Sequence, residues 1–436
     1  MPKGPSIRQQ LLSCFQHGPF ARYMAGEAVS MTGSWMQVMA QGWVMTTLTS
    51  SAVMLGLVNF ATGLPMLILA LKGGVLADKL NKRHILILAQ ILQIASALSI
   101  GWLVHTQQIQ IWHIITIATL LGIVFAFEMP AVNALVPELV HPHQISTAIA
   151  IDRSVFHGTR LLGPAIAGYV VARWGEATAF YLNALSFLAL IAALLSFRSP
   201  PKQKPSHPAQ NQEGIAAGLR YVRSDHPTVS MLGLMTLSTL FVFPVLVVMM
   251  PLYARHLLQL DPTHMGWLMG LTAFGSLTGA LGLLAIPSHH RCAVFLTMVL
   301  GVGAGLAGLS LAPSFAWAAP SLILLALCVS SIVGLAHTII QERAPSQMRG
   351  RVSAIAGLSF FGIMPFASLG ITYLADLITM RTTLALSAAA YTLLALPIVL
   401  GPSRRLWEQS PRTEPPAPRT PPQQPEEDPI PPHGFA

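Results

Sequence analysis

The sequence predicts an all-α polytopic membrane protein, with twelve transmembrane helices in two six-helix, pseudo-symmetric bundles. Of its 436 residues, 53% are hydrophobic and only 9% are charged, against about 25% charged residues in a typical soluble domain. Apolar runs long enough to cross a bilayer recur along the chain, and one long polar segment divides them into two sets of six. We therefore expect the chain to be solvated mainly by lipid.

Each predicted span is an apolar run close to the roughly 20 residues that a membrane-spanning helix needs. Helices are favoured over barrel strands, since strands would show roughly ten-residue segments of alternating hydrophobicity and these runs are longer and continuously apolar. The runs cover about 20–48, 52–72, 84–105, 111–137, 145–172, 177–197, 228–254, 263–287, 292–311, 315–341, 351–376 and 380–401.

A segment rich in Pro, Lys and Gln separates the sixth run from the seventh. In its second part, Ile215, Leu219 and Val222 share one helical face, which predicts an interfacial amphipathic helix. From Ser410 onward, repeated prolines predict a disordered tail. The predicted organisation is a cytoplasmic N-terminus (1–19), an N-terminal six-helix bundle (20–197), a cytoplasmic linker with the amphipathic helix (198–227), a C-terminal six-helix bundle (228–402) and a Pro-rich cytoplasmic tail (403–436).

The basic residues follow the predicted topology. With both termini in the cytoplasm, most of the 25 Lys and Arg residues fall in cytoplasmic segments, whereas only Arg173, Arg255 and Arg381 fall on the other face. This asymmetry is the positive-inside pattern of multi-pass membrane proteins. The net charge of +9 is therefore explained by the lipid bilayer as partner, without nucleic acid.

A short charged turn, Gly73 to His84, lies between the second and third runs. Its residues Gly74, Leu76, Ala77, Asp78, Lys79, Lys82 and Arg83 match the pattern Gly-x-Leu-Ala-Asp-Arg-x-Gly-Arg-Arg, and the segment resembles the loop between helices two and three of the major facilitator superfamily. Asn81 replaces a glycine, a change we expect to be tolerated because Asn visits the left-handed conformation readily. The equivalent segment of the second half, Ser288 to Arg291, lacks the acid.

Further stretches resemble the branch of that superfamily that includes the bacterial enterobactin exporter and the transmembrane secretion effectors. They are residues 127–131, 134–140, 160–168, 182–187 and 349–352. The resemblance implies the major facilitator fold, a multi-pass protein of the bacterial inner (cytoplasmic) membrane, and transport by alternating access. Pro137-Glu138 and Glu342-Arg343 are separated by roughly 200 residues, as are Pro164 and Pro365, which is typical of transporters that rock one half against the other.

The resemblance also implies a cytoplasmic gate. Asp78 is expected near the N-terminus of the eleventh helix, where it can pair with Arg349 or Arg351 and accept hydrogen bonds from free backbone N–H groups. The alternative is that these charges only anchor loops in water. The candidate gate residues are Gly74, Asp78, Lys79, Lys82, Arg83, Glu138, Glu342, Arg343, Arg349 and Arg351.

Charged side chains inside the spans are the main candidates for mechanism, because each costs at least about 2.5–3.5 kcal/mol in the bilayer centre and is expected to face the interior and pair. In the first half they are Glu27, Glu128, Asp152, Arg153 and Arg160, and the second half has only Asp376, near an outer helix end. Three acids against two arginines leave one acid without a full partner. We hypothesise proton-coupled antiport with Glu128 as the favoured carrier, Glu27 second, and Arg153 or Arg160 competing for the carboxylate; the alternative is static ion pairing.

The first span has a polar stripe at intervals of three and four residues, formed by Glu27, Ser30, Ser34, Gln37 and Gln41. Such a stripe is predicted to line a water-filled path, or alternatively to make interhelical hydrogen bonds. His337 and Gln341, one turn apart on the tenth span, are further candidates for the substrate path, although a lone membrane His is more often a packing residue. Gly158, Gly163, Pro164 and Gly168 resemble the fifth-helix motif of exporters, and ordinary helix packing is the alternative.

The sequence offers no nucleotide-binding Gly-x-x-x-x-Gly-Lys-Ser/Thr loop, no metal-ligand cluster and no nucleophile with a base beside it, so no enzyme activity and no cofactor are predicted. We therefore expect a secondary transporter, a proton-coupled exporter of a siderophore, drug-like or other amphiphilic small molecule, acting as a monomer. An importer of a small solute is the first alternative. A membrane scaffold or sensor without transport is the second.

Overall fold

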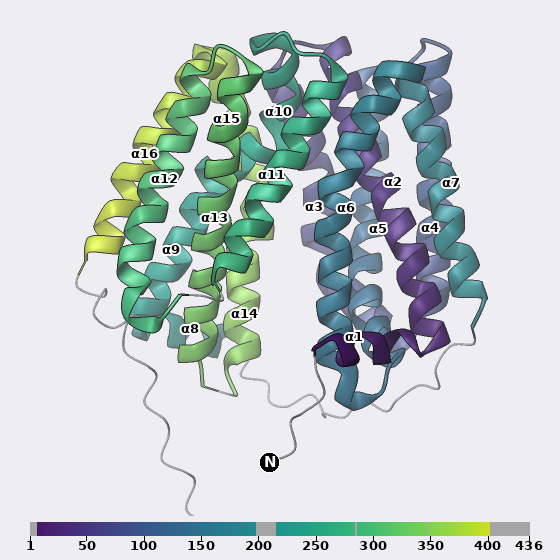
Figure 1. The fold of residues 1–436 in the computed structure, drawn as a ribbon, viewed down its shortest axis with the longest axis horizontal. Helices are drawn as coiled ribbons and strands as arrows, with labels where there is room; N and C mark the ends of the chain where they lie inside the picture. The colour runs from purple at the N-terminus through teal and green to yellow at the C-terminus, as the bar shows by residue number, and fades with distance from the viewer. Residues whose placement is uncertain (1–6, 198–214, 284–285, 346, 402–436) are drawn as a thin grey trace, which may run out of the picture.

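The computed structural model describes residues 7–197, 215–283, 286–345 and 347–401, and every regular element among them is a helix. Figure 1 shows two helical bundles side by side. The first comprises α1 (Ile7–Phe15), α2 (Gly18–Leu48), α3 (Ala52–Lys79), α4 (Lys82–His105), α5 (Ile111–Glu138), the short η1 (Pro142–Gln144), α6 (Ile145–Trp174) and α7 (Glu176–Leu195).

The second bundle follows the linker helix α8 (Ile215–Ser224). It comprises α9 (His226–Phe241), η2 (Val245–Met249), α10 (Met250–Leu252), η3 (Tyr253–Leu257), α11 (Pro262–Gly282), η5 (Ser288–His290), α12 (Arg291–Leu311), α13 (Phe315–Arg343), α14 (Arg349–Gly357), η6 (Leu358–Gly362), α15 (Met364–Ile378) and α16 (Met380–Leu400). The segments α9 to η3 and α14 to α15 each form one long, interrupted span.

Nine segments of the described chain are long and apolar enough to cross a membrane. The helices α2, α6 and α11, of 31, 30 and 21 residues, pack among them. Their lower apolarity has a simple cause in α2 and α6: α2 carries Glu27 and the polar stripe, and α6 carries Asp152, Arg153 and Arg160. Together these are twelve long helical segments within the described residues, consistent with the twelve predicted spans, and the predicted all-α fold of two bundles is confirmed.

The charged turn between the second and third spans is shorter than the sequence suggested. Helix α3 continues through Gly73 and Gly74 to Lys79, so only Leu80 and Asn81 separate it from α4. The sequence suggested a left-handed conformation for Asn81, but its backbone is extended (φ −75°, ψ 114°). Its side chain caps α4 by accepting a hydrogen bond from the Arg83 N–H (3.0 Å). At Gly73 the helix passes so close to α5 that a Cβ would overlap the Ala126 carbonyl oxygen, so this position requires glycine.

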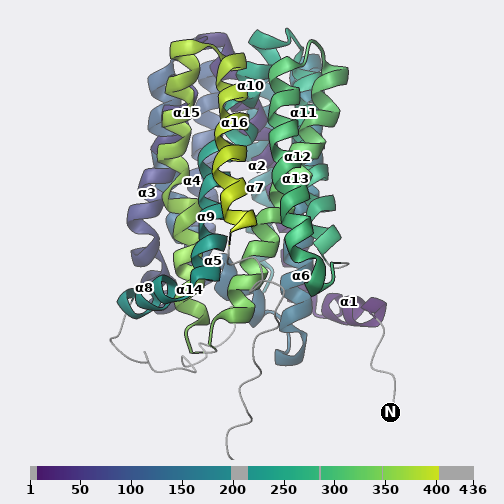
Figure 2. The same cartoon turned by 90° about the vertical axis from the view of Figure 1, so that its left-hand side faces the viewer.

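Helices α1 and α8 lie across the same end of the molecule in Figure 2, which we call the α8 end; the opposite end is the far end. Helix α8 covers the segment predicted as amphipathic and packs on α14, with Ala217 and Val222 buried and Leu219 exposed. Helix α1, which the sequence did not suggest, lies in the predicted N-terminal segment. The predicted tail falls outside the described residues.

The two halves meet through two equivalent helix pairs, α3 with α15 and α6 with α11. Each pair has a proline from the predicted internal repeat at its contact. A Cβ at Gly63 of α3 would overlap the Pro365 ring, and a Cβ at Gly266 of α11 would overlap the Pro164 carbonyl oxygen. The repeat in sequence therefore corresponds to a repeat in the interface.

The apolar core shows where the halves join. One large buried cluster contains Met39 and Met45 of α2 together with Met250 and Met265 of the second half. A second cluster, which includes Phe20 at the α8 end of α2, draws all its members from the first half. The shared core therefore lies toward the far end, where the two bundles come together in Figure 1.

Candidate transport site

Two adjoining cavities of about 300 and about 370 Å³ lie between the halves. They share Ser34, Trp35, Val38, Gln93 and Phe125, so together they form one continuous wall along α2, α4 and α5. The first cavity reaches the second half, where Val247, Val248, Pro251 and Met269 line it. The second is lined by Glu27, Glu128, Asp152 and Arg153, and by Phe361 of the second half.

The polar stripe of α2 lines both cavities. Glu27, Ser30 and Ser34 face the second cavity, and Ser34, Gln37 and Gln41 face the first. Two of these residues also make interhelical hydrogen bonds: Ser30 Oγ donates to Gln90 Oε1 of α4 (3.2 Å), and Gln37 Oε1 accepts from Asn183 Nδ2 of α7 (2.7 Å). The stripe thus lines the two cavities and also makes interhelical hydrogen bonds, while its role as a water-filled path stays a prediction.

Glu128 lies in a hydrogen-bonded network rather than in an ion pair. Its Oε1 accepts from Gln90 Nε2 (2.7 Å) and its Oε2 accepts from Gln93 Nε2 (2.8 Å). Through Gln90 the network continues to Ser30 of α2. Glu27, one turn away on the same helix, is 5% exposed. Among the described residues, neither Glu27 nor Glu128 has a lysine or arginine nitrogen within 4.0 Å.

The two intramembrane arginines have other contacts. Arg153 lies 3.9 Å from Asp152, its neighbour on α6, with 57% of its side chain exposed, and it donates to Asn133 Oδ1 (3.2 Å). The Arg160 guanidinium stacks over the Trp35 ring at 5.6 Å. In this conformation both arginines are therefore separate from the Glu128 network, and their competition for that acid stays a prediction.

At the α8 end, the ion pairs of the predicted gate residues each join helices of one half. Lys82 of α4 pairs with Glu138 of α5 (2.7 Å), and Arg291 of α12 pairs with Glu342 of α13 (2.7 Å). The halves are therefore not linked by these pairs in the conformation observed.

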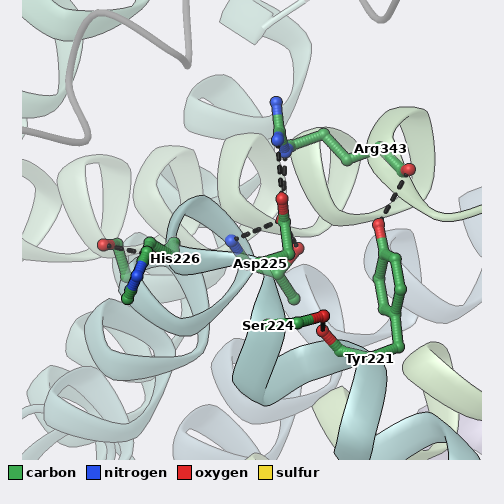
Figure 3. Close-up of polar contacts among 7 residues, drawn as sticks. Tyr221, Ser224, Asp225, His226 and Arg343 are labelled. Carbon is green, nitrogen blue, oxygen red and sulfur yellow. Dashed lines mark hydrogen bonds and ion pairs between the residues drawn. The ribbon is translucent and has the colours of Figure 1, made fainter.

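Arg343 makes the third pair, with Asp225 between α8 and α9, as Figure 3 shows. Its Nη2 donates to Oδ1 (2.6 Å) and its Nε to Oδ2 (3.0 Å), while Tyr221 Oη donates to the Arg343 carbonyl oxygen (2.9 Å). Burial acts to raise the pKa of Asp225, but hydrogen bonds from Arg343 and Thr228 outweigh it and hold that pKa below its ordinary value. Arg343 thus ties the linker helix to α13.

Three of the remaining gate candidates contact residues of their own half. Arg83 Nη2 donates to the Leu195 carbonyl oxygen (3.4 Å), Arg349 Nε donates to the Ala344 carbonyl oxygen (3.2 Å), and Arg351 lies against Met348. Lys79 is exposed, and a Cβ at Gly74 would meet no atom within 4 Å. The side chain of Asp78 lies outside the described part of the structure, so its contact with Arg349 or Arg351 stays a prediction.

At the far end, by contrast, polar contacts cross between the halves. The Asp376 carboxylate of α15 accepts from Ser51 Oγ (2.5 Å) and from the N–H groups of Ala52 (2.7 Å) and Val53 (3.0 Å), which begin α3. Nearby, Arg255 of η3 donates to Thr46 Oγ1 (3.4 Å) and its guanidinium lies 4.8 Å from the Trp43 ring centre. At the far end, the two halves are therefore joined by contacts of charged side chains as well as by apolar packing.

The other candidates are placed away from the network. His337 is exposed and lines neither cavity, and Gln341 donates to Ser353 Oγ of α14. On α6, Gly163 lies against Trp35, and Gly168 packs against α11, whereas a Cβ at Gly158 would meet no atom within 4 Å. Gly158 is therefore not a close-packing position in this structure, unlike Gly163 and Gly168.

The sequence profile of the transmembrane secretion effector family, a branch of the major facilitator superfamily, matches residues 10–424. This chain belongs to that family.

Two efflux proteins are similar to this chain over most of its length. The multidrug efflux pump Tap of Mycolicibacterium fortuitum is 24% identical over 400 residues, which cover 88% of this chain and 94% of Tap. Macrolide efflux protein A of Streptococcus pyogenes is 22% identical over 386 residues, covering 86% of this chain and 94% of that protein. The family and these relatives are transporters, not enzymes.

Solved structures share the fold of this chain. A mutant form of the nucleoside transporter NupG superposes with a TM-score of 0.70 at 14% identity, covering 91% of this chain and 99% of that one. A bacterial homologue of the iron transporter ferroportin, described as inward-facing, gives a TM-score of 0.65 at 15% identity, covering 90% and 98%. These likenesses establish the major facilitator fold.

Sequence reasoning missed the partners of the acids. Gln90 and Gln93 lie three residues apart in an otherwise apolar span, so their spacing placed them on one face of α4, and that was the available signal. Asp376 was noticed, but its partner Ser51 lies 325 positions away in the sequence. Asp225 lies in the segment taken as a linker, and only the structure brings it to Arg343.

Proposed function

We propose that this protein is a proton-coupled exporter of amphiphilic, drug-like molecules that carry a cationic group. It works by alternating access, as a monomer in the bacterial inner membrane, with the α8 end and both termini in the cytoplasm. The efflux activities named for Tap and for macrolide efflux protein A support export of drug-like cargo. The basic residues concentrated in the predicted cytoplasmic segments support the orientation.

The second cavity is the observation that carries the proposal. Its wall combines apolar and aromatic side chains with three carboxyl groups, those of Glu27, Glu128 and Asp152, against the single guanidinium of Arg153. Apolar walls with a few placed polar groups are typical of small-molecule sites. An excess of carboxyl groups in a low-dielectric space favours either a bound cation or bound protons.

This choice between cation and proton supplies the coupling. Glu128 as carboxylate attracts the cationic group of the cargo from the cytoplasmic side; protons entering from the outside neutralise the acid and release the cargo. Glu27, two turns of α2 before the shared wall residue Ser34, is the second carrier. No lysine or arginine within 4.0 Å competes with a proton for either acid among the described residues.

The contacts between the halves support alternating access. The polar contacts of Asp376 and Arg255 join the halves at the far end, whereas the ion pairs of Lys82, Glu342 and Arg343 at the α8 end stay within one half. We assign this conformation to the state closed toward the outside. In the opposite state, Asp78 would close the α8 end against the first turn of α14.

Purified protein in proteoliposomes with an acidic lumen tests the proposal. The probe is ethidium, whose permanent charge prevents it from accumulating as a weak base would. Wild-type protein is expected to accumulate ethidium while the gradient lasts. Glu128→Gln is expected to lose gradient-driven accumulation and to retain a weaker downhill exchange of ethidium, because Glu27 and Asp152 still line the cavity. The matched control is Glu176→Gln at the start of α7, outside both cavities, which is expected to behave as wild type.

Gradient-driven accumulation by Glu128→Gln equal to that of wild type would remove Glu128 from the carrier role. Accumulation of an anionic siderophore in place of ethidium would change the cargo class. Uptake of a solute into cells that express the protein would favour the importer. Absence of both proton flux and cargo movement would favour a scaffold.

A further inference from the structure

Two glutamines of α4 hold the Glu128 carboxylate at the cavity wall. Each of its oxygens accepts one amide N–H, from Gln90 and from Gln93 respectively. Gln90 is 1% exposed and Gln93 is 4% exposed, so a single carboxylate is the acceptor for two buried amides. Both donors are uncharged amides deep in the protein, and packing alone does not explain why both are directed at the same carboxylate.

We propose that Gln90 and Gln93 are positioning residues that hold Glu128 in its charged form and set the pH at which it takes up a proton. The inference rests on the proposed role of Glu128 as carrier and deepens it, because it names the groups that determine when the carrier is loaded.

The chemistry of the two groups supports this role. A carboxylate only accepts hydrogen bonds, so two N–H donors match its charged form, one to each oxygen. When a proton arrives from water in the cavity, one oxygen becomes an O–H donor, and the amide facing it must turn its carbonyl oxygen toward Glu128. The proton adds to the carboxylate, and no other covalent bond forms or breaks.

Ser30 allows this turn at Gln90. Its Oγ donates to Gln90 Oε1 in the charged state (3.2 Å). A hydroxyl both donates and accepts, so after the amide turns, Ser30 Oγ accepts from Gln90 Nε2 instead. Ser30 lies on α2, one turn from Glu27. Protonation of Glu128 on α5 therefore changes hydrogen bonds on α4 and then on α2, the helix that carries the second acid.

The remaining groups around Glu128 do not replace these donors. From α2, Glu27 and Tyr23 face the same region; from α6, Asp152 and Arg153 do, whereas His157 lies near Arg153 and Arg160 and lines neither cavity. Helix α3 and the second half contribute the apolar Met66 and Phe361. Within the described residues the nearby acids oppose the Glu128 charge and Arg153 donates to Asn133, so the two amides are its direct partners.

The test is the pH dependence of ethidium transport in proteoliposomes that contain wild type, Gln90→Leu or Gln93→Leu. Loss of one donor to a charged acceptor is expected to move the pH of half-maximal transport upward by about one to two pH units. Ser96→Ala is the matched control, because Ser96 is buried on the same helix, donates only to the Leu92 carbonyl oxygen (2.8 Å) and lines neither cavity. It is expected to keep the wild-type midpoint.

Infrared titration of the purified protein makes the test independent of transport. The carboxylic-acid band that disappears in Glu128→Gln reports protonation of Glu128 directly. It is expected to form at higher pH in Gln93→Leu and Gln90→Leu than in wild type. An unchanged midpoint of this band in both folded variants would overturn the inference.

The two proposals fail separately. Proton-driven transport that persists in Glu128→Gln would remove the carrier itself. A transport defect in Glu128→Gln together with wild-type pH midpoints in both glutamine variants would leave the carrier in place and reduce Gln90 and Gln93 to packing residues.

Discussion

Asp376 and Ser51 form a 2.5 Å hydrogen bond that joins the last turn of α15 to the residue preceding α3. The same carboxylate also accepts the N–H groups of Ala52 and Val53. Free N–H groups and the positive end of the helix dipole make the start of a helix a favourable place for a carboxylate. One acid of the second half therefore caps the first turn of a helix of the first half.

Asp376→Asn is expected to shift the population toward the state that is open at the far end. The neutral amide loses the interaction with the helix dipole and part of the hydrogen bonding, which for an exposed carboxylate amounts to about 1–2 kcal/mol. That energy corresponds to a roughly 5- to 30-fold change in the ratio of the two states. Spin labels at Gln108 and Pro313, in far-end connections of opposite halves, report the distance by pulsed electron resonance.

Labelling first requires replacement of the native cysteines Cys14, Cys292 and Cys328. Ser51→Ala is the matched partner variant, since it removes one of the three hydrogen bonds and is expected to give a smaller shift in the same direction. A distance distribution that is identical in wild type and Asp376→Asn would show that the contact does not hold the halves together.

The helical spans were predictable because bilayer thickness dictates their length. A run such as 111–137 needs no tertiary information to be recognised, and α5 (Ile111–Glu138) agrees with it. The turn at Asn81 was harder, because the same residue suits a left-handed turn and a helix N-cap, and the choice depends on where α4 begins. Local sequence does not decide between those two uses.

The site was predictable where charge, or the regular polar stripe of α2, marked it. Glu27, Glu128, Asp152 and Arg153 were found because ions are costly in lipid, and the structure places all four on one cavity wall. Neutral Gln90 and Gln93 carry a much weaker signal. The sequence predicted that one of the three acids would lack a full arginine partner and favoured Glu128 as the carrier. In the structure Glu128 accepts from two amide donors, which satisfy a carboxylate without a second charge.

Asp225→Asn is expected to lower stability at neutral pH by about 1–3 kcal/mol, through loss of the ion pair with Arg343. Asparagine also caps helices well, so the hydrogen bond to the Thr228 N–H is preserved and the ion pair is the interaction removed. Thermal unfolding in detergent measures the effect, with the pH varied between runs.

The pH dependence of this difference has a definite sign. Hydrogen bonds from Arg343 and Thr228 lower the pKa of Asp225 in spite of burial, so its contribution is complete above the unfolded-state pKa of about 3.9. It is lost as the pH falls below that value through the folded-state pKa. The melting temperatures of wild type and Asp225→Asn are thus expected to converge in acid, and a difference that stays constant across the range would contradict the ion-pair explanation.

Gly168→Ala and Gly158→Ala, on the same helix, are expected to have opposite effects on stability. A Cβ at Gly168 would lie 2.6 Å from the Pro262 carbonyl oxygen and 3.2 Å from the Gly266 Cα of α11, so the alanine must push α6 and α11 apart, at about 1–3 kcal/mol. A Cβ at Gly158 would meet nothing within 4 Å, so there the alanine contributes its higher helix propensity, up to about 1 kcal/mol. The melting temperature is expected to fall for the first variant and to hold or rise for the second. Because Gly168 lies where α6 of the first half packs on α11 of the second, Gly168→Ala is also expected to increase the spin-label distance at the far end. Equal melting temperatures for the two variants would mean that the contact at Gly168 relaxes without cost.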